Sequence, residues 1–163
     1  MTLDYRQFTK DISKIDLEDI CSEWQWLLNH QYKPIIVSLS GDMFMTATDG
    51  TIHWLDTGIG KLQKVAETEE AFKAALQDID NIDSWLLASV VLDLLDRGMI
   101  LKENQVYSYK LLPILNGDFS TDNFEMTDMS VHFSITGQIC KQVKDMPDGT
   151  PISVAINPFI KSN

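Results

Sequence analysis

The spacing of apolar residues around Asp49-Gly50 predicts a β-hairpin. On each side of this pair, apolar side chains occupy every second position: Met43, Met45, Ile52 and Trp54. Alternation of this kind indicates half-buried strands, and an Asp-Gly pair between two such runs favours a tight turn. We therefore expect hairpin strands at 43–47 and 52–56. Further strands are expected at 34–39, 61–65, 105–112 and 152–156.

Other segments have the three-to-four-residue apolar spacing of amphipathic helices. They are 17–28, 68–79, 82–97 and 131–144. In the last segment, the alternation of Val131, Phe133 and Ile135 also fits a strand start, and Gly137 is unfavourable in a helix. The segment 82–97 is apolar almost all round and is followed by Gly98, so we expect it to be the most buried helix. Residues 114–128 are polar and contain a glycine, which predicts a loop. Residues 1–15 show no clear pattern, and partial fraying is expected there.

Strands first, a helical pair in the middle and mixed elements last predict an α+β fold. We expect a single domain over 1–163, with a mainly antiparallel sheet and helices packed on one face. A chain of 163 residues can bury about 70% of its unfolded surface. The most apolar segment, 85–95, is too short to cross a bilayer, and the N-terminus lacks a secretory pattern. A cytoplasmic location is the resulting expectation.

The charge of the chain is strongly negative and unevenly placed. The formal net charge is −11, and the stretches 34–60, 74–96 and 111–140 contain acids but no Lys or Arg. Acidic surfaces keep proteins in solution, and they also suit a partner with a positive face. Direct binding to nucleic acid is not expected, because phosphate contacts need a basic patch. Membrane binding is not expected either.

The sequence contains no motif typical of catalysis or metal binding. Its histidines and cysteines lack metal-ligand spacing, and Cys21 and Cys140 are expected to be small buried residues. Asp42, Asp49 and Asp56 recur every seven residues, yet one turn position and two strand ends explain them better than a metal site. P-loop, dinucleotide-binding and serine-hydrolase motifs are absent. We expect no enzyme activity, no metal and no cofactor.

Several acids and one tryptophan are candidates for binding a protein partner. Trp26 lies off the apolar stripe of its predicted helix, and exposed tryptophans are enriched at the centres of interfaces. The alternative is that another element of the same chain packs over it. The acids come from the base-free stretch 111–140 and from the hairpin turn. The hypothesis therefore names Asp118, Asp122, Glu125, Asp128, Asp49 and Trp26.

A series of short motifs runs from about Leu17 to Ile156. In chain order they are Trp24-x-Trp26-Leu27-Leu28, Gly41-Asp42-x-Phe44, Asp49-Gly50-x-Ile52, Leu55-Asp56-x-Gly58-x-Gly60, Asp83-x-Trp85-Leu86, Gln105-x-Tyr107, Pro113-x-Leu115-x-Gly117 and Gln138-Ile139-x-x-Gln142-x-Lys144-Asp145-x-Pro147-Asp148-Gly149. In this order they resemble the family of bacterial type VI secretion immunity proteins named for an immunity protein that protects against a DNase toxin. No binding residue carries over, because the shared motifs indicate turns and core.

The resemblance implies a protein that binds and neutralises a cognate bacterial toxin without catalysing a reaction. A nuclease toxin presents a positive groove to DNA, and carboxylates can occupy that groove in place of phosphates. The expected partner is therefore a basic, nuclease-type toxin, occluded stoichiometrically. One alternative is a stand-alone module that binds another protein or a small ligand, without a toxin partner. Another is a hydrolase whose site the sequence does not reveal.

Overall fold

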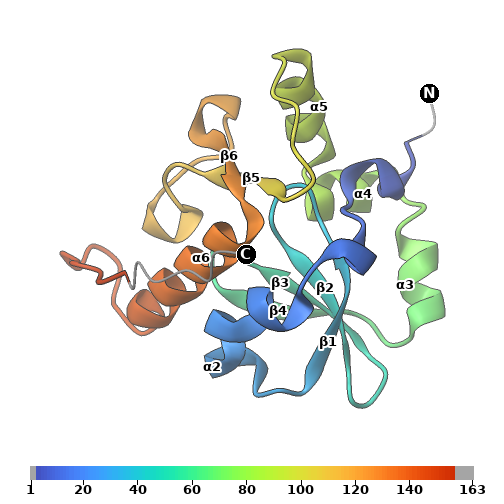
Figure 1. The fold of residues 1–163 in the computed structure, drawn as a ribbon. Coiled ribbons are helices and arrows are strands. Elements are labelled where there is room, and N and C mark those ends of the chain that lie inside the picture. The colour runs from blue at the N-terminus through green and yellow to red at the C-terminus, as the bar shows by residue number, and fades with distance from the viewer. Residues whose placement is uncertain (1–2, 157–163) are drawn as a thin grey trace.

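A four-stranded antiparallel sheet lies at the centre of the molecule (Figure 1). The computed structural model describes residues 3–156. The strands follow one another in the sheet as in the chain: β1 (Tyr32–Val37), β2 (Met43–Ala47), β3 (Ile52–Asp56) and β4 (Lys61–Ala66). The predicted hairpin is confirmed, because β2 and β3 pair antiparallel within the predicted bounds.

Two further strands form a separate antiparallel ribbon, β5 (Gln105–Tyr109) with β6 (Phe124–Asp128). The ribbon is joined to the far end of β1, where the Tyr107 N–H donates to the Leu39 carbonyl over 2.7 Å. The prediction of a loop throughout 114–128 is wrong for β6. Its polar residues Glu125 and Thr127 concealed a strand that forms because β5 supplies its hydrogen-bond partners.

Apart from α6, which has nearly the predicted bounds, the helices are shorter than the periodicity predicted. They are α1 (Leu17–Cys21), α2 (Gln25–Leu28), α3 (Glu69–Ala75), α4 (Ile79–Leu86), α5 (Ala88–Asp96) and α6 (Met129–Val143), with short 3₁₀ turns at Tyr5–Phe8, Ile12–Lys14, Ser22–Trp24, Pro113–Leu115 and Thr121–Asn123. Asp16 and Thr68 cap α1 and α3 as side-chain acceptors, as capping preferences favour. Among the described helices, none has the length and hydrophobicity to cross a membrane.

The single buried helix predicted at 82–97 is instead two helices. Leu87 has a φ of 51°, a left-handed conformation that separates α4 from α5. The Asp83 carboxylate accepts from the Ser89 N–H over 2.8 Å and so supports the break. The second helix is only half buried, since Leu92 on α5 is 40% exposed. Local hydrogen bonding therefore overrides the apolar pattern here.

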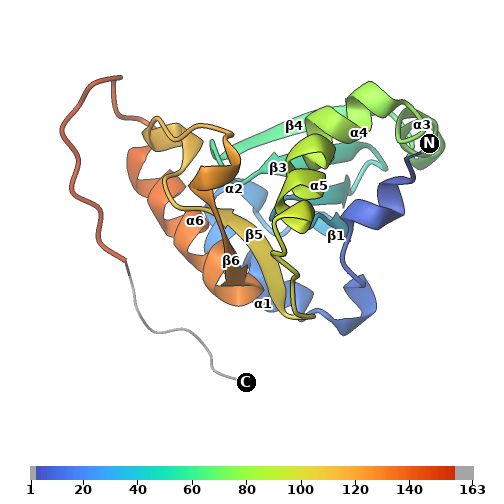
Figure 2. The same cartoon turned by 90° about the horizontal axis from the view of Figure 1, so that it is seen from above.

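Two hydrophobic clusters show that helical segments cover both faces of the sheet. One cluster packs Phe44 of β2 against α3, α4 and α5, and the other packs Met43 and Met45 against α1 and α6. The α+β class is confirmed, but the expectation of helices on one face is corrected. Figure 2 shows the β5–β6 ribbon between α6 and α5, so the ribbon also has a packed element on each side.

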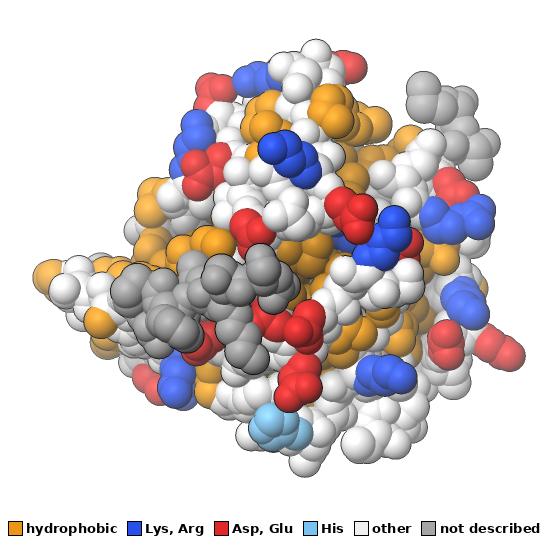
Figure 3. Space-filling model, in the orientation of Figure 1, with side chains coloured by type: hydrophobic (Ala, Val, Ile, Leu, Met, Phe, Trp, Pro, Cys, Tyr) orange, Lys and Arg blue, Asp and Glu red, His pale blue; other side chains and the backbone are white. Residues whose placement is uncertain are grey.

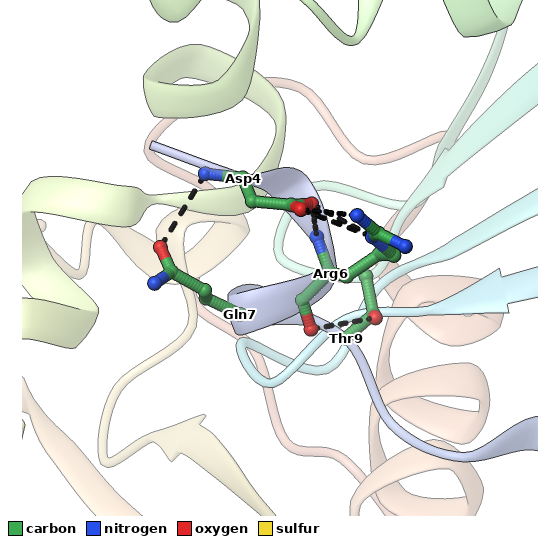
Figure 4. Close-up of polar contacts among 4 residues, drawn as sticks. All are labelled: Asp4, Arg6, Gln7 and Thr9. Atoms are coloured by element: carbon green, nitrogen blue, oxygen red, sulfur yellow. Dashed lines mark hydrogen bonds and ion pairs between the residues drawn. The ribbon is translucent and has the colours of Figure 1, made fainter. Parts of the chain in front are cut away.

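The described part of the N-terminal region is folded rather than frayed. Asp4 caps the first 3₁₀ turn: its carboxylate accepts from the Arg6 backbone and guanidinium, and its own N–H donates to Gln7 (Figure 4). Phe8 is buried in the core, and Thr9 forms a bridge with Ser38 at the end of β1. This region lacked a readable period because its segments are single turns.

The closing strand predicted at 152–156 is not formed, because residues 151–156 have no regular secondary structure. Pro147-Asp148-Gly149 forms a turn, in which the Thr150 N–H donates to the Pro147 carbonyl. Beyond it, Ala155 pairs with the side-chain amide of Gln142 through two hydrogen bonds of 2.7 and 2.9 Å. The Gln142 side chain on α6 thus forms the two backbone hydrogen bonds that a partner strand would otherwise provide for Ala155.

Candidate functional site

Part of the base-free stretch, residues 111–128, forms a surface that we name the acidic lobe. Asp118, Asp122 and Glu125 are exposed on it. Large apolar side chains are exposed beside them: Leu111 at 47%, Phe119 at 51% and Met126 at 40%. Acids and apolar side chains exposed together are typical of protein-binding surfaces rather than of an inert solvated face.

The acidic lobe is held rigid mainly by one side chain, Asn123. Its amide accepts from the Leu111 N–H and donates to the carbonyls of Leu111 and Asp118, over 3.0, 2.9 and 2.8 Å. Gly117 lies so close to the Leu111 carbonyl that an added Cβ would stand 1.7 Å from its oxygen. The loop therefore has one defined shape, although it contains little regular structure.

The three exposed acids of the lobe differ in the hydrogen bonds and ion pairs that they already form within the protein. Asp122 forms an ion pair with Arg97, whose guanidinium lies 2.9 Å from its carboxylate. Asp118 accepts from the N–H and hydroxyl of Ser120, and these hydrogen bonds lower the pKa of its carboxyl. Glu125 lies on β6 opposite Ser108. Asp122 would have to give up its ion pair with Arg97 to bind a cationic partner. Within residues 3–156, Asp118 and Glu125 have no such competing ion pair.

Asp128 has a structural role at the edge of a different hollow. It caps α6 by accepting from the Ser130 N–H over 2.9 Å, and it also accepts from the Asn104 amide. The hollow, of about 330 Å³, is lined by Asp16, Asp19, Glu103 and Asp128 among other residues. Figure 3 shows several carboxylates gathered at and below the middle of one face, with Lys and Arg side chains spread around them at the top, left and right.

Asp49 lies far from the acidic lobe. The turn that contains it follows Ala47, which pairs with Tyr32 at the start of β1, whereas β5 joins the molecule at Leu39, beyond the end of β1. Asp49 and the lobe are thus at opposite ends of the sheet (Figure 1). Its carboxylate accepts from the Thr51 N–H and hydroxyl, as an Asx turn requires.

Trp26 is covered by another part of the same chain, which was the alternative expected for it. Its indole stacks on Trp24 with ring centroids 5.7 Å apart, and its Nε1–H donates to the Gly137 carbonyl of α6 over 3.2 Å. The Lys144 ammonium lies 5.8 Å from the ring centroid. Trp26 therefore connects α2 to α6 through this hydrogen bond and contributes to the packing between them.

A buried polar cluster that the sequence did not predict connects the hairpin, the ribbon and α6. His132 accepts from or donates to three neighbours: Nδ1 lies 2.7 Å from the Ser108 hydroxyl, and Nε2 lies 2.7 Å from the Gly41 carbonyl and 3.2 Å from the Thr57 hydroxyl. A carbonyl can only accept, so Nε2 carries the hydrogen and Nδ1 accepts from Ser108. The neutral imidazole is thereby fully satisfied.

Asp42 completes the cluster from the other side of Thr57. Its carboxyl accepts from the Trp54 indole N–H and from the N–H and hydroxyl of Thr57, over 2.9 to 3.0 Å. Burial, and then the nearby charge of Asp56, raise the pKa of Asp42 well above its ordinary value. Sequence signals existed for part of this cluster, since Asp42 and Thr57 stand beside glycines at the two ends of the hairpin.

The Ser108–His132 pair has the spacing of a base-activated hydroxyl, yet its environment opposes catalysis. Burial lowers the pKa of His132 to about 4, so the imidazole is a weak base at neutral pH. Both residues are buried, at 7% and 1% exposure. Burial also raises the pKa of the thiols Cys21 and Cys140, to about 11 and about 12, and these cysteines are buried as expected.

No group of three or more His, Cys, Asp or Glu side chains within residues 3–156 is arranged to hold a metal ion. Asp42, Asp49 and Asp56 are instead occupied by hydrogen bonds from the backbone N–H groups of Thr57, Thr51 and Gly58. These contacts are the ones that strand-end and turn aspartates favour.

Comparisons with known proteins agree with the order of motifs in the sequence. Residues 66–140 match the family model described as T6SS immunity protein Tdi1, C-terminal. This segment contains β5, β6 and most of α6, and therefore the whole acidic lobe. The search of curated proteins gives no match.

A similar solved structure is the crystal structure of Atu4351 from Agrobacterium tumefaciens, with a TM-score of 0.53 and 17% sequence identity. The alignment covers 76% of this chain and 65% of that chain, so the present chain spans less than two thirds of its length. At this identity the likeness shows a common fold and nothing more. The family-model match supports the resemblance seen in the motifs: residues 66–140 of the chain are similar to the C-terminal region of the type VI secretion immunity protein Tdi1.

Proposed function

We propose that this protein binds a cognate type VI secretion toxin and blocks it by stoichiometric occlusion. The observation that carries the proposal is the position of the acidic lobe inside the segment that matches the Tdi1 family. The toxin partner follows from the family. A basic, nuclease-type toxin is inferred from the charge of this chain, −11, because a nuclease must attract DNA phosphates and an acidic protein can compete for the same groove.

The proposed contact surface is centred on Asp118 and Glu125. Their carboxylates are exposed, and the exposed Leu111 and Phe119 beside them supply apolar area. Specific complexes bury about 1,600 Å² in total, so the lobe forms the centre of the interface and neighbouring surface forms its rim. The protein needs no catalytic group for this activity, and we infer that it acts in the cytoplasm of the cell that it protects.

The first test is co-expression with the protein encoded by the adjacent gene. We expect that this neighbour stops growth when expressed alone, that co-expression restores growth, and that the two purified proteins form a 1:1 complex in size-exclusion chromatography with light scattering. A neighbour that is harmless, or a toxic neighbour that forms no complex with this chain, would contradict the proposal and favour a binding module without a toxin partner.

A charge-reversal experiment tests the acidic lobe itself. We expect the double variant Asp118→Lys and Glu125→Lys to weaken the complex by at least tenfold at low salt and to flatten its salt dependence, because exposed charges are screened within about 10 Å at 0.1 M salt. The matched control is Glu70→Lys with Asp80→Lys, which changes net charge equally on the exposed helices α3 and α4. Equal losses in both double variants would rule out a specific role for the lobe.

A further inference from the structure

A groove of about 200 Å³ lies between α6 and the β5–β6 ribbon, beside the turn at 110–115. Its walls are mainly aliphatic, and they are formed by Leu111, Leu112, Leu115, Ile135 and Ile139. Pockets for drug-sized molecules enclose about 300–1,000 Å³. This groove is smaller and has room for one large side chain.

The side chains of Ser108 and His132 offer a guest no free hydrogen-bond donor. Both line the groove, but the serine hydroxyl donates to Nδ1 of the imidazole, and Nε2–H donates to the Gly41 carbonyl. A guest with hydrogen-bond acceptors would lose bonds to water that these two residues do not replace, which costs free energy. With its mainly aliphatic walls, the groove therefore favours an apolar guest.

The rim of the groove adds a second selection, by charge. Glu125 stands on the rim. Leu111, 47% exposed, lies between this groove and a second hollow that Asp118 and Asp122 line. Lys110 also lines the groove, and Arg97 pairs with Asp122. Asp118 and Glu125 remain as two acids near Leu111 against one lysine. A guest side chain flanked by basic residues therefore fits the groove best.

The groove is formed in advance of binding. Asn123 holds Leu111 by two hydrogen bonds to its backbone, and the Gly117 N–H donates to the Leu112 carbonyl over 2.9 Å. A wall that is already ordered costs little conformational entropy when a partner docks.

We propose that this groove is the anchor pocket of the immunity protein: it takes one apolar side chain of the cognate toxin, while basic residues next to that side chain in the toxin contact Glu125 and Asp118. This inference rests on the proposed function. The inference adds one pocket to the proposed function, and we expect this pocket to contribute most of the binding energy. Buried central anchors commonly contribute most of the binding energy at interfaces.

Two pairs of variants test the anchor pocket, with the purified product of the adjacent toxin-like gene as the probe in calorimetric titration. Leu111→Ala removes a wall of the groove, and Leu92→Ala is its control, since Leu92 on α5 is similarly exposed at 40%. Thr127→Phe places bulk at the rim, and Gln63→Phe is its control at an exposed strand position on β4, outside the acidic lobe. Thermal melting of each variant verifies that it is folded.

We expect Leu111→Ala and Thr127→Phe each to weaken binding at least tenfold, and both controls to stay within twofold of the unchanged protein. If the unchanged protein binds and each groove variant matches its control, the anchor pocket is disproved while the proposed function stands. If the unchanged protein neither binds the toxin nor restores growth, the proposed function fails and the anchor pocket fails with it.

Discussion

The acidic side chains of this protein differ in whether they already form hydrogen bonds that stabilise the fold. Asp128 caps α6, and Asp42 is enclosed by three donors, so neither is available to a partner. Glu125 is exposed on β6, next to an apolar groove. The carboxylates that we propose for recognition are therefore a small part of a large negative charge. Counting acids in the sequence could not separate the two groups.

His132 gives the stability of the protein a specific pH dependence. Burial lowers its pKa from 6.5 to about 4 in the folded protein. As pH falls, the unfolded chain takes up this proton near 6.5, while the folded protein takes it up only near 4. Stability is therefore present above pH 6.5 and is lost as pH falls toward 4. The full loss is on the order of 3 kcal/mol.

The variant His132→Gln tests this assignment by urea unfolding between pH 7.5 and pH 4. We expect the variant to be less stable at pH 7.5 and to lose less stability on acidification than the unchanged protein. Asp42 and Asp56 have raised pKa values, which make stability fall with rising pH, but they are present in both proteins and cancel in the comparison. Parallel curves for the two proteins would show that His132 does not titrate as described.

The residues of the hairpin turn show that a sequence pattern predicts where a turn lies but not its conformation. The Asp49-Gly50 turn was placed correctly, but in a type I′ turn both central residues have positive φ. Here Gly50 has a φ of 88°, while Asp49 is not among the residues with positive φ. The loop is therefore longer than two residues, closed by a Gly50 N–H to Ala47 hydrogen bond. Pattern gives the position of a turn, and backbone hydrogen bonds decide its type.

Among the elements, edge strands differ in how open they are to a partner. The outer strand β4 carries Lys61 and Lys64, and lysines on an edge discourage pairing with another chain. The strand β6, paired with β5 alone, carries Glu125 and the half-exposed Met126 instead. A cationic partner is thus repelled from one edge and attracted to the other.

The packing of α6 on the first helices depends on a glycine that helix propensity disfavours. A Cβ at Gly137 would lie 2.7 Å from the Glu23 carbonyl oxygen. Propensity alone predicts that Gly137→Ala stabilises the helix by about 1 kcal/mol. We expect the opposite sign, a loss of about 1–3 kcal/mol, because the backbone of another element must move.

Denaturant unfolding of Gly137→Ala decides between these signs. Ser134→Ala in the same helix is the control, and we expect it to change stability by less than about 0.5 kcal/mol. A Gly137→Ala variant that unfolds at higher denaturant concentration than the unchanged protein would refute the packing argument.

The elements that the sequence predicted well are those in which the spacing of apolar residues matches the spacing of buried positions in the structure. The strands β2, β3 and β4, and the helix α6 with its four-residue apolar spacing, were expected close to their observed bounds. The pattern failed for β6, for the break at Leu87 and for residues 152–156. In each of these places a contact distant in the sequence or a local side-chain hydrogen bond determines the backbone, and neither leaves a period in the chain.

At the scale of the whole molecule, two layers of helices enclose the sheet, and the ribbon projects from its end (Figures 1 and 2). The candidate site lies on that projection, inside the segment of the family match. Sequence reasoning proposed the stretch 111–140 from its charge, and the structure exposes Asp118, Asp122 and Glu125 of that stretch on one surface. It could not find the groove, because Leu111 and Ile139 come together only when α6 folds back along the ribbon.

The bonds of His132 to Gly41 and Thr57 have a consequence for how the chain can be divided. Phe133 beside it packs among Trp24, Met43 and Leu55, so the segment of the family match contains half of a core and depends on the preceding half. We expect 66–143 expressed alone to lack near-ultraviolet circular dichroism. Mixed with a separate 1–65 fragment, it should regain the signal by complementation. The segment that matches the family model is thus smaller than the unit that we expect to fold.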